Sequence, residues 1–221
     1  MLLKLTTALL LLAALPAAAQ EKKNDDKPAE QTEKPDAKKE DKLAPAVLGK
    51  PAPDFTLNDV DGKPVKLSDF KGKLVVLEWF DQECPYCQYA YSESGPLAEL
   101  PERMKKQGVV WLTIHSGTSA KPEAMKKFAQ ERKLTAPMLI DADGKVCTAY
   151  AAKRTPHCFV IDEKGVLRYR GALDNAPMGK VSDKETKTNY VESAVNALKN
   201  GKAVTTQETK PYGCPIKSAK G

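Results

Sequence analysis

The stretch LVVLEWFDQECPYC, residues 74–87, places an apolar run directly before two cysteines that stand two residues apart. Leu74 to Phe80 is almost continuously apolar, which is typical of a central strand that is covered on both faces. Cys84 follows a short polar turn, and Pro85 suits the first turn of a helix, where no backbone N–H is needed. The stretch therefore predicts a buried strand, a turn, and a helix that begins at a pair of cysteines.

Further strands and helices are expected on both sides of this stretch. Apolar runs predict strands at residues 109–114, 138–140, 158–162 and 166–169, the last two joined by a hairpin turn at 163–165. Helical patterns cover residues 85–93, 97–107, 122–133 and 189–198. This order predicts an α/β fold, with a mixed central sheet and helices on both faces.

The two ends of the chain differ in composition from the middle. Residues 1–19 have the build of a secretory signal peptide, with Lys4, an apolar run and small residues before a cleavage site after Ala19. Residues 20–45 are predicted to be a disordered charged linker, because residues 20–42 contain no large apolar side chain. Residues 46–200 then form one domain, and residues 201–221 form an extension that carries a cysteine. We expect a periplasmic or secreted protein with no permanent membrane span after cleavage.

The net charge of +6 is spread over the folded part without basic blocks. Such a charge gives little reason to expect a nucleic-acid partner. We expect a monomer that does not bind nucleic acid.

Three motifs in this order resemble the redoxin domains. They are Pro53-Asp54-Phe55-Thr56-Leu57, the segment LSDFKGK at residues 67–73, and Thr155-Pro156-His157 before an apolar strand. Redoxin domains are the thioredoxin-like proteins that span the AhpC/TSA-related peroxiredoxins and the extracytoplasmic thiol-disulfide oxidoreductases of the TlpA and ResA type. The resemblance covers about residues 46–198, and it implies a thioredoxin-like fold and a thiol-disulfide oxidoreductase that needs no cofactor. Its partners would be protein thiols and disulfides, together with a redox partner that the sequence does not identify.

Cys84 and Cys87 are the candidate redox-active disulfide. A cysteine at the start of a helix lies near unpaired backbone N–H groups, which stabilise its thiolate. Cys84 is therefore the expected nucleophile. Cys87, one turn further on, is the expected resolving thiol, which attacks the mixed disulfide formed at Cys84.

Pro156 and Glu78 complete the candidate catalytic set. The Thr155–Pro156 bond is a plausible cis site, and in the resembling family this proline packs beside the cysteine pair and shapes the substrate groove. Glu78 interrupts the apolar strand, at a place where thioredoxins also carry an acid. If it is buried, its pKa would be raised and it could take the proton from Cys87. The alternative is a glutamate at the end of the strand that reaches water.

Two acids set this chain apart from many members of the resembling family. Glu83 stands where those members have Trp, directly before Cys84, and Asp81 lies close by. Their negative charge should raise the pKa of Cys84. This expectation favours the reducing direction, because a strong oxidant stabilises its reduced form.

Three more cysteines are possible accessory thiols. A Cys147–Cys158 bridge is one hypothesis, and a free buried Cys158 is the alternative. Cys214 could dock on the active site as a third redox thiol, or it could form a staple to Cys147.

Four alternatives remain open. A thiol peroxidase of the peroxiredoxin kind would have Thr three residues before its reactive cysteine, where this chain has Asp81. A copper-binding redoxin similar to the Sco family would join Cys84 and Cys87 to His157 or His115, but its cysteines are spaced CxxxC. A zinc site would need a second pair of ligands, which is absent from the sequence. A non-enzymatic adaptor would not need Cys84.

Overall fold

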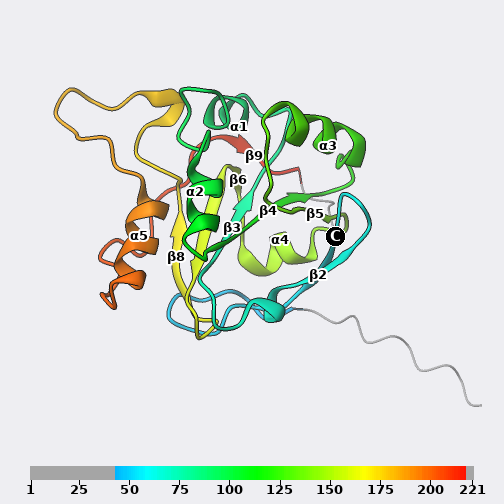
Figure 1. Ribbon diagram of the computed structural model, residues 1–221, viewed down its shortest axis with the longest axis horizontal. Coiled ribbons are helices and arrows are strands. Elements are labelled where there is room, and N and C mark those ends of the chain that lie inside the picture. Colours follow the sequence, from blue (N-terminus) through cyan, green and yellow to red (C-terminus); the bar gives the residue numbers. More distant parts are fainter. Residues whose placement is uncertain (1–42, 218–221) are drawn as a thin grey trace, which may run out of the picture. The chain divides into compact units, whose positions relative to one another are not determined.

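A mixed seven-stranded sheet is the centre of the computed structural model, which describes residues 43–217 (Figure 1). The expected signal peptide and nearly all of the expected linker lie outside the described residues. The strands follow the order β2-β1-β5-β4-β3-β7-β8. Their bounds are Thr56–Asp59 (β1), Pro64–Lys66 (β2), Val75–Trp79 (β3), Val110–Ser116 (β4), Met138–Asp141 (β5), His157–Ile161 (β7) and Leu167–Gly171 (β8).

The direction of the strands makes the sheet mixed, as expected. β3, β4 and β5 are parallel neighbours, whereas β7 runs antiparallel to β3 and β8 antiparallel to β7. The hairpin of β1 and β2 joins the other edge through an antiparallel pairing of β1 with β5. A separate two-stranded pairing joins Arg154–Thr155 (β6) to Cys214–Pro215 (β9).

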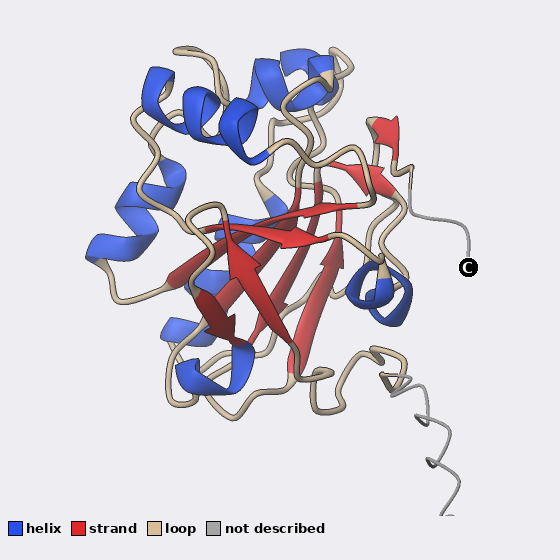
Figure 2. Cartoon of the chain, turned by 90° about the vertical axis from the view of Figure 1, so that its right-hand side faces the viewer, coloured by secondary structure: helices blue, strands red, loops and turns tan. Residues whose placement is uncertain are grey.

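Helices cover both faces of the sheet, as Figure 2 shows. Their bounds are Pro85–Ala90 (α1), Leu100–Lys106 (α2), Pro122–Glu131 (α3), Lys145–Tyr150 (α4) and Tyr190–Lys199 (α5). The buried side chains of α1, α2, α3 and α5 belong to one apolar cluster, which we call the thiol-side core. Those of α4 belong to a second cluster on the opposite face, which we call the α4-side core.

The alternation of side chains along β3 divides it between the two cores. Val75, Leu77 and Trp79 lie in the α4-side core, and Val76 lies in the thiol-side core. Because successive side chains of a strand point to opposite faces, Glu78 points to the same face as Val76. All five residues of β3 are buried, so the continuous apolar run marks a strand that is covered on both faces, as predicted.

The helix after the cysteine pair is shorter than its pattern predicted. It ends at Ala90, and residues 91–99 form turns before α2 begins at Leu100. In these turns the backbone of Gly95 lies so close to the Tyr89 carbonyl oxygen that a Cβ at this position would be 2.1 Å from it. The chain therefore doubles back here, where the sequence predicted more helix up to residue 93.

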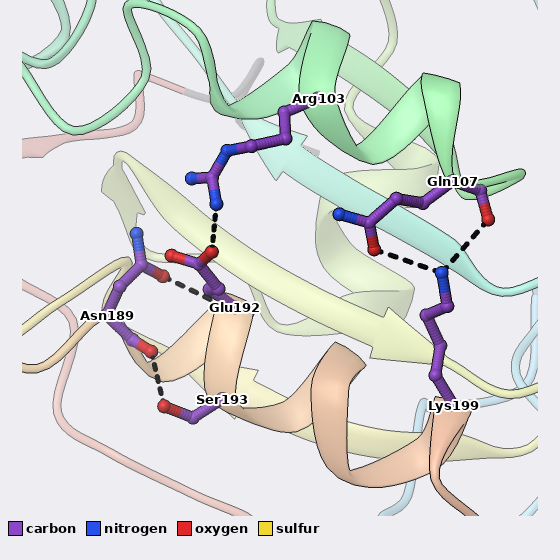
Figure 3. Close-up of polar contacts among 6 residues, drawn as sticks. All are labelled: Arg103, Gln107, Asn189, Glu192, Ser193 and Lys199. Atoms are coloured by element: carbon purple, nitrogen blue, oxygen red, sulfur yellow. Dashed lines mark hydrogen bonds and ion pairs between the residues drawn. The ribbon is translucent and has the colours of Figure 1, made fainter.

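The last helix is fastened to α2 by polar contacts that Figure 3 shows. Asn189 caps α5 by accepting a 2.9 Å hydrogen bond from the backbone N–H of Glu192, and the Glu192 carboxylate pairs with Arg103. At the far end, Lys199 Nζ donates to the side chain and the backbone carbonyl of Gln107. These contacts hold α5 beside α2 over the thiol-side core.

None of the helices within residues 43–217 combines the length and the apolar character needed to cross a membrane.

Candidate active site

Cys84 lies at the N-cap of α1, at the end of a tight turn that follows β3. Asp81 builds this turn, because its carboxylate accepts a 2.8 Å hydrogen bond from the backbone N–H of Glu83 and its carbonyl accepts one from Cys84. Pro85 occupies the first helical turn, as predicted. The turn and the helix together bring both cysteines to the end of β3 as buried residues.

The proline loop packs directly on Cys84. The Cys84 thiol donates a 3.1 Å hydrogen bond to the carbonyl oxygen of Thr155. The Thr155–Pro156 peptide bond is cis, as the sequence indicated. Two segments that are 71 residues apart in the chain therefore meet at the sulfur atom of Cys84.

The environment of Cys84 lowers its pKa to about 4, which contradicts the expectation of a raised value. The largest cause is a hydrogen bond from the Cys87 thiol, and the thiol of Cys214 and the side chain of Thr155 act in the same direction against the cost of burial. The two acids do not reverse this effect. The Glu83 side chain is 69% exposed and lies 3.6 Å from Lys121 Nζ, so solvent and an ion pair screen its charge.

Cys87 is fully buried one turn after Cys84. Burial is the main cause that raises the pKa of Cys87 well above its usual range, and the neighbouring Cys84 thiolate and Glu78 carboxylate add to it. The pair is thus asymmetric, with a thiolate at the turn that precedes α1 and a protonated thiol one helical turn further on. This division of roles is the one that a nucleophile and a resolving thiol require.

Glu78 is fully buried, so the alternative in which it reaches water is wrong. Its Oε2 accepts hydrogen bonds from the Tyr91 hydroxyl (2.5 Å) and from Trp111 Nε1 (2.9 Å), while its Oε1 has no partner among the described residues. Burial raises the pKa of Glu78 to about 7, although both hydrogen bonds act in the opposite direction. A carboxyl with this pKa exchanges protons at neutral pH.

Tyr91 and Trp111 belong to the site, although the sequence analysis did not identify them. Tyr91 follows Cys87 by four residues, which places it on the same side of the helical turn, and this spacing is the one sequence signal for it. Trp111 comes from β4, which lies beside β3. No short-range pattern connects Trp111 with Glu78, because the two residues meet only when the strands pair.

The structure places Cys147 and Cys158 on opposite sides of the sheet. Cys158 is in β7, pairs with Glu78 across the strands, and lies in the thiol-side core, whereas Cys147 lies in the α4-side core. All five cysteines are free thiols. The hypothetical Cys147–Cys158 bridge and the hypothetical staple from Cys147 to Cys214 are therefore both wrong, and the alternative of a free buried Cys158 is confirmed.

Cys214 does lie at the active site. The strand β9 pairs with β6 in a register that sets Cys214 opposite Thr155, the residue whose carbonyl receives the hydrogen bond from Cys84. Figure 1 shows β9, drawn in red, beside β6 at the same end of the sheet as α1. Of the three additional cysteines, this is the one that joins the pair.

The two histidines do not complete a metal centre. His157 is the first residue of β7 and packs against Phe159 of the α4-side core, with 4.6 Å between the ring centroids and the rings tilted, so it faces away from the thiols. Burial lowers the pKa of His157 to about 3 and that of His115 below its usual value. Within residues 43–217, no group of three or more His, Cys, Asp or Glu side chains suits a metal ion.

The chain is similar to known proteins over about half of its length or more. The model of the AhpC/TSA family matches residues 48–170. The thiol-disulfide oxidoreductase ResA of Geobacillus thermodenitrificans is 36% identical over 129 residues, which are 58% of this chain and 70% of that protein. ResA of Bacillus subtilis is 32% identical over 117 residues, which are 53% of this chain and 63% of that protein.

Two solved structures resemble a larger part of the chain. An uncharacterised conserved protein from Geobacillus kaustophilus is 31% identical with a TM-score of 0.70, and the match covers 79% of this chain and 94% of that one. A hypothetical protein from Sinorhizobium meliloti is 26% identical with a TM-score of 0.69, covering 81% and 98%. These likenesses identify the fold as thioredoxin-like.

Proposed function

The chain belongs to the AhpC/TSA family and is a thiol-disulfide oxidoreductase of the ResA type, and we propose that Cys84 and Cys87 are its redox-active pair. The observation that carries this proposal is the asymmetry of the two thiols. Cys84 has a pKa of about 4 and lies at the turn, while Cys87 is fully buried with a pKa well above the usual range. A pair that must attack in a fixed order needs such a difference.

The proposed reaction has two steps. In the first, the Cys84 thiolate attacks one sulfur of a substrate disulfide, a bond forms between Cys84 and that sulfur, and the other substrate sulfur leaves as a thiolate. In the second, Cys87 loses its proton to Glu78 and attacks the Cys84 sulfur. The Cys84–Cys87 disulfide forms, the second substrate sulfur leaves, and two electrons have passed to the substrate.

Pro156 and Thr155 have a positioning role in this proposal. The Thr155 carbonyl oxygen lies 3.1 Å from the Cys84 sulfur, and Pro156 follows it between β6 and β7. The proline thereby shapes the surface that a substrate disulfide must approach. Extended peptides commonly bind to strand edges through backbone hydrogen bonds, and β6 is the strand that such a peptide would use here after displacing β9, which pairs with it.

We expect the reduced protein to reduce a protein disulfide rapidly and to consume hydrogen peroxide slowly. Insulin is a suitable disulfide substrate, because its reduced chains precipitate and the turbidity can be followed with dithiothreitol as the electron source. The control is the same protein after its thiols have been alkylated. A peroxidase turnover that exceeds the disulfide turnover would replace this proposal with the peroxiredoxin alternative.

We propose the reducing direction as the physiological one, but on a reason different from the one that the sequence offered. The acids do not raise the pKa of Cys84. What supports reduction is that a pKa of about 4 keeps the attacking thiolate populated at neutral pH. The same stabilisation of the thiolate makes the pair less reducing at equilibrium, so the reduction potential is the quantity that decides.

We expect the reduction potential of the Cys84–Cys87 pair to lie well below that of the strong oxidant DsbA, which is about −120 mV. Equilibration with glutathione redox buffers, followed by quenching and mass analysis of the free thiols, measures it. A potential close to about −120 mV would reverse the proposed direction.

The place of action and the partners are also part of the proposal. The signal-peptide pattern of residues 1–19 supports a location outside the cytoplasm, where protein disulfides persist. The substrates would be protein disulfides there, and a separate reductant would restore the thiols. The monomeric state and the lack of a nucleic-acid partner stay predictions.

A further inference from the structure

The segment of residues 207–217, which we call the strap, runs from the edge of the sheet to the active site. It starts beside β8, where the backbone N–H of Arg170 donates to the Gln207 carbonyl and that of Thr209 donates to the Arg170 carbonyl. The Thr209 side chain then packs against Gly171 so closely that a Cβ on this glycine would lie 2.2 Å from the Thr209 hydroxyl. These contacts fix the direction in which the strap leaves the sheet.

The strap next crosses the proline loop. The Tyr212 hydroxyl donates a 2.6 Å hydrogen bond to the buried carboxylate of Asp174, and its ring packs on Tyr86 of α1 with 5.9 Å between the centroids. Gly213 has a φ of +104°, and a Cβ here would lie 2.1 Å from the Thr155 carbonyl oxygen. Glycine at this position is therefore what allows the strap to lie directly against the loop.

The strap ends its crossing as a strand on β6. Thr155 pairs with Cys214, Arg154 pairs with Pro215, and the backbone N–H of Ile216 donates to the Lys153 carbonyl. This is the strand edge that the proposed function leaves for an extended substrate. Cys214 occupies the position at which a substrate cysteine would face Cys84.

We propose that Cys214 is a third redox-active thiol, which the strap presents to Cys84 as an internal substrate and which exchanges with the Cys84–Cys87 disulfide. The proposal rests on the proposed function, because it requires Cys84 to react by thiol-disulfide exchange. The proposal is that Cys214 not only lies beside Cys84 but also reacts with it.

The reaction is an isomerisation that needs no further oxidant or reductant. In the oxidised protein, the Cys214 thiolate attacks the Cys84 sulfur. The Cys84–Cys214 bond forms, the Cys84–Cys87 bond breaks, and Cys87 leaves with the electron pair and is protonated in its buried position. The number of disulfides and thiols stays the same, and attack by Cys87 on Cys84 reverses the step.

The electrostatics of the three thiols direct this step to the oxidised protein. In the reduced protein, burial and then the hydrogen bond and charge of the Cys84 thiolate raise the pKa of Cys214 to about 11. When Cys84 is part of a disulfide it carries no charge, so two of the causes that suppress the Cys214 thiolate are removed. Cys214 therefore becomes a better nucleophile when Cys84 is a target for attack.

The exchange has a consequence for substrates. A peptide that pairs with β6 must first displace β9, so the strap competes with substrate for one strand edge. The Cys84–Cys214 disulfide closes that edge covalently and leaves Cys87 reduced. The site then opens only when Cys87 or an outside thiol attacks the bridge.

The test uses the Cys87→Ser protein, in which Cys214 is the remaining thiol that the strap places beside Cys84. Glutathione disulfide should first form a mixed disulfide at Cys84. Cys214 should then expel glutathione and close a Cys84–Cys214 bridge. Mass spectrometry distinguishes this bridge from the adduct, and peptide mapping locates it.

Two further variants test separately the Cys214 thiol and its position beside Cys84. Cys87→Ser/Cys214→Ser keeps the strap without the thiol, and Cys87→Ser/Gly213→Val keeps the thiol but forces the strap away from Thr155.

We expect the adduct to persist in the first double variant, and to close about tenfold or more slowly in the second, because proximity is lost. Cys87→Ser/Cys158→Ala is the matched control and should close at the rate of Cys87→Ser. If the adduct forms but persists in Cys87→Ser, or if Gly213→Val does not slow closure, the role of Cys214 is refuted and the proposed function stands. If no adduct forms at Cys84 in any variant, the proposed function itself fails, and this inference fails with it.

Discussion

The Cys87→Ser/Cys214→Ser protein, which lacks both thiols that could resolve a mixed disulfide, is expected to stop at a covalent adduct with its substrate. The serine hydroxyls at positions 87 and 214 can still donate hydrogen bonds to Cys84, as the two thiols do, so its thiolate remains available and the first attack still occurs. The serine hydroxyl that replaces the buried Cys87 thiol cannot resolve the mixed disulfide. Steady-state disulfide turnover should fall by about three orders of magnitude or more, because the two cysteines act as a unit. Non-reducing gel electrophoresis with a disulfide-containing protein substrate would show the adduct, and dithiothreitol would release it.

Two companion variants make this trapping specific. In Cys84→Ser, adduct and turnover should both be lost, because the nucleophile is absent. In Cys87→Ser alone, the trapped fraction should be smaller than in Cys87→Ser/Cys214→Ser, because Cys214 can displace the substrate from Cys84. An adduct on Cys84→Ser, or normal turnover by Cys87→Ser/Cys214→Ser, would contradict the assignment of nucleophile and resolving thiol.

The central strands and the helix at the cysteine pair could be predicted because their signals are local. The apolar run of residues 74–80 is bounded by polar turns, and Pro85 marks the helix start directly after Cys84. The pairing of β6 with β9 has no such signal. Each strand has two residues, they are about sixty positions apart, and neither has enough residues to show a period of two.

The predictions about the site that proved wrong depended on contacts and distances in the folded protein, which the sequence does not contain. The expectation for Cys84 counted two nearby acids but not the neighbouring thiols of Cys87 and Cys214, which lower its pKa. The hypothetical bridge from Cys147 to Cys158 ignored the sheet between them, since the two side chains lie in cores on opposite faces. The alternation of side chains along β7 likewise places His157 on the face of the sheet opposite the thiols. In each case the deciding contact is made by segments that are distant in the chain.

The sequence suggested that Glu78 is buried but could not decide it. A single acid in an apolar run can be a buried carboxyl that accepts a proton, or a glutamate at the end of a strand that reaches water. What decides is the pair of donors, Tyr91 and Trp111, that converge on one of its oxygens. A buried carboxyl that serves stability alone would be expected to have partners for both oxygens. The second oxygen of Glu78 has none among the described residues, which is consistent with a group that exchanges a proton.

Glu78→Gln is expected to slow resolution of the mixed disulfide by about 100-fold, at the lower end of the contribution of general acid–base catalysis. Formation of the mixed disulfide should keep its rate, because Cys84 does not depend on this carboxyl. In the wild-type protein the resolution rate should rise with pH through about 7, where Glu78 ionises, and this inflection should be absent in the variant. Stopped-flow measurement of both steps between pH 5 and 9 tests this. Equal loss in both steps would show a structural role instead.

The same titration should appear in stability, with a fixed sign. The pKa of Glu78 is about 7 in the folded protein and 4.5 without the fold, so between these values the folded state binds the proton more tightly. Its contribution to the free energy of unfolding is therefore complete below pH 4.5 and is lost as the pH rises through 7. The loss is at most about 3 kcal/mol. The lowered pKa of Cys84 changes the free energy of unfolding with pH in the opposite direction, but it does so in both the wild-type protein and Glu78→Gln. Wild-type stability relative to Glu78→Gln should thus decrease between pH 4.5 and 8 in urea unfolding.

Asp141→Asn is the matched control for both readouts of Glu78. Asp141 is a fully buried carboxyl whose oxygens accept hydrogen bonds from Ser116 and from the backbone N–H groups of Val146 and Cys147, and it faces the α4-side core. Its neutralisation removes a buried negative charge and weakens the start of α4, so it should lower stability while leaving the resolution rate and its inflection near pH 7 in place. If Asp141→Asn slowed resolution as much as Glu78→Gln, the rate would be following general destabilisation, and Glu78 would lose its role as the acceptor of the Cys87 proton.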